Sequence, residues 1–137
     1  MKLEPPDPKR SALMARVRQR GTTPELVVAS VLRKLGFAYR RNVRALAGSP
    51  DFSNRKREWA IYVQGCFWHH HTGCVRATAP KANEAFWRDK FTTTRRRDAK
   101  AIRTLRRKSF RVVVVWECET RQLERLTTRL AKALGGL

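Results

Sequence analysis

The sequence contains no long hydrophobic run. No stretch of about 18 apolar residues occurs along its length, and the N-terminus lacks the apolar segment of a signal peptide. We therefore expect neither a membrane span nor secretion, and a cytoplasmic location follows by default. A chain of 137 residues fits one domain that buries a single core.

Acidic residues are also scarce. The chain has 11 aspartates and glutamates against 31 lysines and arginines, a formal net charge of +20. A charge of this size attracts nucleic acids, membrane surfaces or acidic proteins. Arginine matches phosphate geometry, and the charge is spread along the whole chain rather than held in one amphipathic helix. Both features favour nucleic acid as the partner.

Cysteine is rare as well, and its three copies cannot all be paired within the chain. Cys66, His71 and Cys74 lie close together, and Cys118 follows the run of valines at 112–115. Tetrahedral zinc is held by this ligand type, so these four residues predict a closed, structural site that stabilises the fold.

The spacing alone leaves the metal prediction open in two respects. His69 and His70 are also within reach and could replace His71 as a ligand. The alternative without metal is that Cys118 is a buried core thiol and that the other two cysteines are incidental.

The pattern of apolar residues predicts an α/β fold. Residues 1–9 hold three of the six prolines, which indicates a flexible N-terminal arm before a single domain over 10–137. The order of helix, strands, helices, strand and helix is typical of α/β proteins. The segments are a helix over 24–35, strands over 37–43, 59–63 and 111–117, one or two helices over 83–108, and a helix over 120–134. The valines of the last strand suggest that both its faces are covered.

Several residues could act on DNA or on a metal ion, each with a structural alternative. Asp51 is a candidate for holding a divalent cation against a phosphate, although an aspartate after Gly-Ser-Pro is often a turn residue. Phe67 and Trp68 could stack on bases or wedge between base pairs, or they could fill the core around the zinc site. The same two alternatives apply to Trp87.

Four segments resemble the very short patch repair (Vsr) DNA mismatch endonucleases. The resemblance runs from about Arg10 to Cys118, and the motifs in this order are highly specific. The segments are Pro50-Asp51-Phe52, Gly65-Cys66-Phe67-Trp68-His69 with His71 and Cys74, Phe86-Trp87, and Val115-Trp116-Glu117-Cys118.

The resemblance implies a variant of the PD-(D/E)XK nuclease fold, with a central mixed sheet flanked by helices. It implies a monomeric enzyme that nicks duplex DNA 5′ of the thymine in T·G mismatches, which arise when 5-methylcytosine deaminates. Mg²⁺ and Zn²⁺ are the implied cofactors. The implied partners, besides DNA, are a cytosine-5 methyltransferase system and mismatch-repair proteins, with the enzyme on the bacterial nucleoid when bound.

The resemblance also implies roles for particular residues. Asp51 and the carbonyl of Val63 hold Mg²⁺, His69 activates the attacking water, and Glu25 lies near the metal-bound waters. The implied zinc ligands are Cys66, His71, Cys74 and Cys118, and the implied DNA-intercalating residues are Phe67, Trp68, Trp87 and Met14.

Gln64 departs from the family pattern, which places a histidine there. Glutamine carries no charge and is a poor proton acceptor, but it can orient a water or a phosphate oxygen by hydrogen bonds. Two alternatives to the repair nickase follow. One is a mismatch or structured-DNA binding protein with weakened catalysis, and the other is a nuclease of the same fold used against foreign DNA.

Overall fold

A computed structural model describes residues 23–66, 71 and 82–135. The predicted arm at 1–9 and the start of the domain lie outside these ranges. The described elements, in chain order, are α2 (Thr23–Leu35), β1 (Arg40–Arg41), β2 (Phe52–Asn54), β3 (Trp59–Gln64), α3 (Glu84–Arg107), β4 (Arg111–Trp116), the 3₁₀ helix η1 (Glu117–Arg121) and α4 (Leu123–Gly135).

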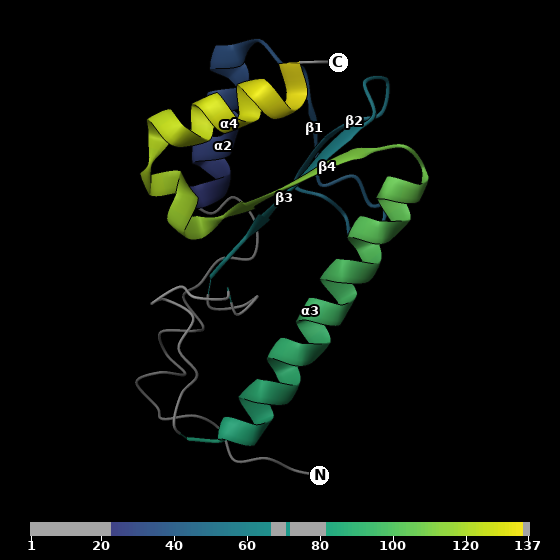
Figure 1. Cartoon of the computed structure of the whole chain (residues 1–137), viewed down its shortest axis with the longest axis vertical. Helices are drawn as coiled ribbons and strands as arrows, with labels where there is room; N and C mark the ends of the chain where they lie inside the picture. The colour runs from purple at the N-terminus through teal and green to yellow at the C-terminus, as the bar shows by residue number, and fades with distance from the viewer. Residues whose placement is uncertain (1–22, 67–70, 72–81, 136–137) are drawn as a thin grey trace.

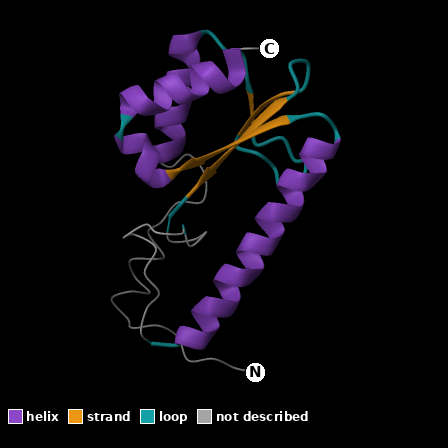
Figure 2. Cartoon of the chain, in the orientation of Figure 1, coloured by secondary structure: helices purple, strands orange, loops and turns teal. Residues whose placement is uncertain are grey.

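The strands form one mixed sheet in the order β1-β2-β3-β4. The first three strands pair antiparallel, with Phe52 opposite Ile61, whereas β3 and β4 pair in parallel from Trp59 and Arg111 to Gln64 and Trp116. A parallel pair needs a crossover connection, and α3 lies within it. Figure 2 shows the strands between the helices.

Helices cover both faces of the sheet, which confirms the predicted α/β architecture with a flanked mixed sheet (Figure 1). α2 and α4 pack on one face, around a core that includes Val28, Leu32, Phe52 and Ile61. α3 packs on the other face, where Leu105 joins a smaller cluster with Ala60 and Tyr62 of β3.

The spacing of apolar residues explains the packing of α2 and α4. In α2, Val28 and Leu32 are spaced one helical turn apart and are fully buried. In α4, Leu126, Leu130 and Leu134 form an equivalent stripe. α2 agrees with its predicted range, whereas α4 begins three residues later than predicted because residues up to Arg121 form η1, and Leu123 at its start is exposed.

The segment predicted as one or two helices forms a single helix, α3, of 24 residues. Its buried positions, which recur at intervals of three, four or seven residues, are Trp87, Phe91, Thr94, Ala101 and Leu105. At about 1.5 Å per residue the helix is roughly 36 Å long, and it extends well beyond the strands (Figure 1). None of the described helices combines the length and apolar character needed to cross a membrane.

Two predicted strands differ from the structure. The strand predicted over 37–43 is reduced to Arg40–Arg41, because Phe37 still bonds to the end of α2 and Asn42 has a positive φ of 53°. β4 is buried on only one face: Val113 and Val115 are buried, and the alternate valines are half-buried. The prediction of two covered faces holds only in part, because α3 packs against Val112 but leaves its face of β4 half-exposed.

Candidate active site and metal cluster

Asp51 directly precedes β2, and its carboxylate reaches β3. The Val63 backbone N–H donates to Asp51 Oδ2 over 2.6 Å. The antiparallel register that pairs Phe52 with Ile61 brings these two residues together, although they are 12 positions apart. On the other side, the Asn42 backbone N–H donates to the Asp51 carbonyl over 3.3 Å. Asp51 is thus held from two segments.

Glu25 lies beside Asp51 and is almost fully buried, at 3% exposure. It belongs to the first turn of α2, and its carboxyl is close enough to that of Asp51 to affect the Asp51 pKa. Arg41 of β1 donates to Glu25 Oε2 over 2.9 Å. Sequence analysis did not single out Arg41, because one arginine in so basic a chain carries no distinguishing signal.

The environment of Asp51 raises the pKa of its carboxyl to about 7. Burial is the main cause, because it penalises the charged form, and the neighbouring Glu25 carboxylate raises the pKa further. The hydrogen bond from Val63 acts in the opposite direction. Without a counter-ion, Asp51 therefore holds a proton near neutral pH.

Asp51 and Glu25 fit a divalent cation. Hard cations such as Mg²⁺ prefer carboxylate and carbonyl oxygens, and a cation between these two neighbouring carboxylates would remove their repulsion. Arg41 already neutralises part of the charge of Glu25. The pair therefore has the chemistry of a metal site with one main carboxylate ligand and a second acidic group beside it.

The turn that contains Ala47 and Gly48 directly precedes Asp51 and is held by contacts with β3 and α3. The Tyr62 hydroxyl donates to the Ala47 carbonyl, and burial followed by the charges of Asp98 and Asp51 raises the pKa of Tyr62 to about 12. Gly48 has φ of +70°, and a Cβ there would lie 2.7 Å from the Ala101 Cβ. Only glycine fits this approach, so the Gly-Ser-Pro turn is packed between β3 and α3.

Gln64 ends β3 and is buried, at 5% exposure. It follows Val63, the residue whose N–H holds Asp51. The structure therefore places Gln64 inside the protein at the same end of the sheet as Asp51. Its predicted catalytic role stays a prediction, as does the role of the Val63 carbonyl.

Three of the four predicted zinc ligands lie together. The Cys66 and Cys118 sulfurs and a ring nitrogen of His71 all lie within 4.8 Å of one another. His71 Nδ1 is 3.7 Å from Cys66 Sγ and 3.6 Å from Cys118 Sγ. The His71 ring also stacks on Trp116, with centroids 4.0 Å apart and planes 7° apart.

The parallel pairing of β3 and β4 explains why these cysteines meet. Gln64 and Trp116 face each other at the ends of the two strands, and each cysteine follows two residues later. Cys66 and Cys118 therefore emerge side by side. Two sulfurs and an imidazole are suitable ligands for zinc, so the residues fit the predicted metal.

Other predicted site residues lie outside the described residues: Met14, Phe67, Trp68, His69, His70 and Cys74. Trp87 is described, and it is buried at 5% exposure, with ring contacts to Phe86 and Phe91. Its predicted insertion into DNA therefore stays a prediction and requires Trp87 to be uncovered.

The surface of α3 is strongly basic. Its exposed arginines and lysines greatly outnumber its two exposed acidic residues, Glu84 and Asp89. Such a surface attracts the phosphates of a nucleic acid. The exposed cations are Arg88, Lys90, Arg95, Arg96, Arg97, Lys100, Arg103, Arg106 and Arg107.

Comparison with known proteins identifies the family. Residues 5–76 match the family model described as DNA mismatch endonuclease Vsr. The chain is 37% identical over 126 residues to the type II nicking enzyme V.XorIIP of Xanthomonas oryzae, covering 92% of each chain. It is 39% identical over 111 residues to V.NmeAIP of Neisseria meningitidis, covering 81% of this chain and 79% of the relative.

A third relative is the DNA mismatch endonuclease Vsr of Escherichia coli. It is 37% identical over 118 residues, which cover 86% of this chain and 75% of the relative. These matches agree with the carboxylate pair, the Cys/His cluster and the basic surface. The chain belongs to the Vsr family of DNA mismatch endonucleases, and it is a DNA endonuclease.

Proposed function

We propose that this endonuclease nicks one strand of duplex DNA 5′ of the thymine in T·G mismatches, in a Mg²⁺-dependent reaction. The mismatches arise by deamination of 5-methylcytosine, so the enzyme starts very short patch repair. The observation that carries the proposal is the pair of the half-buried Asp51 and the buried Glu25, in a chain whose relatives are mismatch endonucleases and nicking enzymes.

In this proposal the Asp51 carboxylate and the Val63 carbonyl hold Mg²⁺. The ion supplies charge stabilisation at the scissile phosphate. The Val63 N–H orients Asp51, and Arg41 orients Glu25, which takes hydrogen bonds from water at the site. His69 accepts the proton of the attacking water.

In this proposal Gln64 lies beside the reacting groups and acts by hydrogen bonding, because its amide does not exchange a proton. Its amide can donate to a phosphate oxygen or accept from a water. Its burial supports a fixed orientation, because a buried amide must satisfy its hydrogen bonds within the protein or with bound water.

The Cys/His cluster is proposed to hold a structural Zn²⁺ through Cys66, His71, Cys118 and, from outside the described residues, Cys74. The ion would tie the segment after β3 to the end of β4. That segment contains Phe67 and Trp68, which are proposed to wedge beside the mismatch. A T·G pair stacks weakly, so unstacking it costs less than unstacking a normal pair.

The remaining DNA contacts and partners follow from the same proposal. Trp87 and Met14 insert beside the mismatch, and the basic surface of α3 contacts phosphates. A cytosine-5 methyltransferase system generates the substrate, and mismatch-repair proteins act on the same DNA. The enzyme acts as a monomer on the nucleoid.

The test uses end-labelled duplexes carrying one T·G mismatch in several flanking sequences, at a fixed salt concentration, with and without Mg²⁺. We expect a single-strand break 5′ of the thymine that depends on Mg²⁺ and is lost in Asp51→Asn. Glu58→Gln removes a negative charge at the opposite end of β3 and should leave nicking unchanged.

Three outcomes contradict the proposal in different ways. Equal cutting of mismatched, methylated and unmodified duplexes would contradict mismatch specificity and favour a defence nuclease. Tight binding without nicking would favour the weakened binding protein, and Gln64→His would then be expected to restore cleavage. Undiminished nicking by Asp51→Asn would remove Asp51 from the reaction.

A further inference from the structure

Two glutamates of η1 bond to the backbone next to the metal cluster. Glu117 Oε1 accepts from the Cys66 backbone N–H over 3.3 Å. Glu119 Oε1 accepts from the Trp116 backbone N–H over 3.1 Å. These residues flank Cys118 on both sides, so η1 contacts both segments that supply the cysteines.

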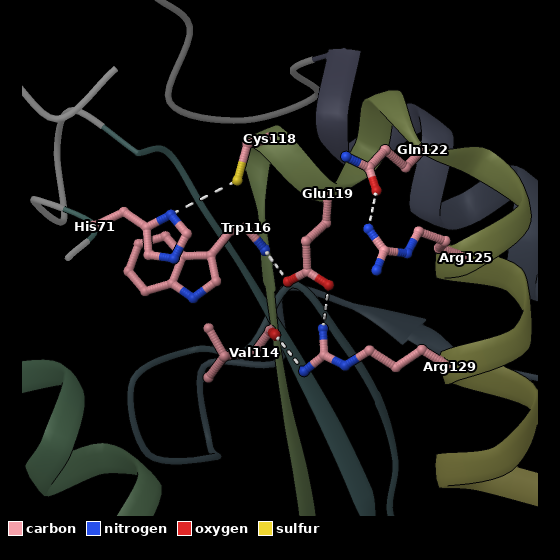
Figure 3. Close-up of polar contacts among 8 residues, drawn as sticks. All are labelled: His71, Val114, Trp116, Cys118, Glu119, Gln122, Arg125 and Arg129. Carbon is pink, nitrogen blue, oxygen red and sulfur yellow. Dashed lines mark hydrogen bonds and ion pairs between the residues drawn. The ribbon is translucent and has the colours of Figure 1, made fainter. Parts of the chain in front are cut away.

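Glu119 is in turn held by α4. Arg129 donates to Glu119 Oε2 over 2.6 Å, and its second guanidinium nitrogen donates to the Val114 carbonyl over 2.9 Å (Figure 3). Arg129 therefore contacts the chain on both sides of Cys118 in sequence: Val114 in β4 and Glu119 in η1. We call Glu119 and Arg129 the η1 bracket.

Trp116 connects the η1 bracket to His71. The ring of Trp116 stacks on His71, and its backbone N–H is the donor to Glu119 (Figure 3). A shift of Trp116 would therefore move the stacking surface of His71 and would also affect Cys118, two residues further along the chain. Fixing this residue fixes two of the three described ligands.

Packing does not hold η1 by itself. None of its residues is fully buried, and residues 117–120 are half-buried, so burial holds η1 less firmly than it holds the core elements. Short 3₁₀ helices have poor internal hydrogen-bond geometry. The position of Cys118 thus depends on polar contacts from outside η1, and the η1 bracket supplies charge-assisted ones.

We propose that the η1 bracket positions Trp116 and Cys118 for metal binding and so slows release of the bound ion. The inference rests on the zinc site of the proposed function. Glu119 and Arg129 are positioning residues in this proposal, because they contact the backbone beside the ligands and not the metal.

The test measures release of Zn²⁺ from the purified full-length protein to an excess of a coloured chelator. Arg129→Ala is expected to speed release about 10-fold, the lower end of the effect typical of groups that orient metal ligands. Glu119→Gln keeps an acceptor for the Trp116 N–H but loses the ion pair, so it should give a smaller increase. Arg129→Lys has one nitrogen for the two acceptors, so its release rate should lie between those of the wild type and Arg129→Ala.

Arg125→Ala is the matched control. Arg125 lies one turn earlier on α4 and is exposed like Arg129, but it donates to Gln122 Oε1 over 2.8 Å (Figure 3). Within the described part of the chain, Arg125 forms no hydrogen bond with β4 or η1. Its removal takes the same charge from the same helix and should leave release unchanged.

Equal release rates for Arg129→Ala and Arg125→Ala, with Zn²⁺ bound to both, would overturn the bracket proposal alone. Protein that neither contains nor takes up Zn²⁺ would overturn the zinc site and the bracket together. Urea unfolding separates positioning from general stability. The proposal requires Arg129→Ala to destabilise the zinc-loaded protein more than the zinc-free protein, and equal destabilisation would contradict it.

Discussion

The carboxylate pair and the Cys/His cluster lie at the same end of β3 but are held in opposite ways. Asp51 and Glu25 are neighbouring acidic groups, and the pKa of Asp51 is raised mainly by burial and further by the Glu25 carboxylate. Cys66, His71 and Cys118 lie together as two sulfurs and an imidazole, and in the proposed function they would gain stability from a shared ion. The first arrangement is unfavourable without its cation and suits catalysis, whereas the second suits structural support.

The comparison predicts that changes at the two sites affect different properties. Loss of a carboxylate should abolish activity and keep the fold, and loss of a sulfur should weaken the fold. The following predictions test this division.

The largest expected effect is on the nicking rate of Asp51→Asn. Loss of the metal-binding carboxylate should lower the rate at least about 10³-fold, because a bound ion supplies several kcal/mol of transition-state stabilisation. Asparagine still accepts from the Val63 N–H, so circular dichroism should show an intact fold. Single-turnover nicking at saturating Mg²⁺ measures the rate, and a loss below tenfold would contradict the assignment.

Cys118→Ala should mainly reduce stability. Cys118 and His71 are 47 positions apart, so a metal between them closes a long loop. We expect the free energy of unfolding in urea to fall by about 3 kcal/mol, a fraction of the binding energy of structural zinc. Removing zinc from the wild type should lower the free energy of unfolding by at least this amount, and wild-type protein unaffected by zinc removal would contradict a structural metal.

The pH dependence of the free energy of unfolding should reveal the raised pKa of Asp51. Folded protein without divalent cations keeps the Asp51 proton up to about pH 7, whereas the unfolded chain loses it near pH 4. Between these values the folded state binds more protons, so raising the pH destabilises it. The stability of the wild type relative to Asp51→Asn should therefore fall between pH 5 and pH 8, by on the order of 2 kcal/mol.

Urea unfolding of both proteins at the two pH values, with Mg²⁺ removed, measures this difference. Zinc contributes equally to both proteins, so it cancels. A constant difference across the range would mean that Asp51 has an ordinary pKa.

The smallest effect should come from Tyr62→Phe, which removes the hydroxyl that supports the turn before Asp51. A lost hydrogen bond costs about 1 kcal/mol, and the carboxylate should become less well positioned. The Mg²⁺ concentration for half-maximal nicking should rise severalfold, with DNA affinity unchanged. An unchanged Mg²⁺ requirement would show that the turn keeps its position without Tyr62.

Sequence analysis predicted the elements better than the contacts between them. The helix at 23–35 and β4 follow from local periodicity, so their ranges were predicted closely. The bond from Val63 to Asp51 depends on strand register, and the ion pair of Arg41 with Glu25 joins residues 16 positions apart. No local pattern encodes such pairings.

The cluster shows the same limit. Cys66, His71 and Cys118 were predicted as ligands because thiols and imidazoles are rare in this chain and stand close together. The stacking of His71 on Trp116 and the contacts of Arg129 could not be predicted, because they require the parallel register of β3 and β4. The burial of Trp87 could not be predicted either, since an aromatic residue on a basic helix can lie in the core or on the surface.

The most direct test of a catalytic cation at Asp51 is the melting temperature of zinc-loaded protein during a Mg²⁺ titration. A ligand that binds only the folded state stabilises it by RT ln(1 + [L]/Kd), so the melting temperature rises with the logarithm of ligand concentration above Kd. We predict such a rise for the wild type and none for Asp51→Asn. An equal rise in both proteins, or none in either, would contradict the assignment of the carboxylate pair as the site that binds Mg²⁺.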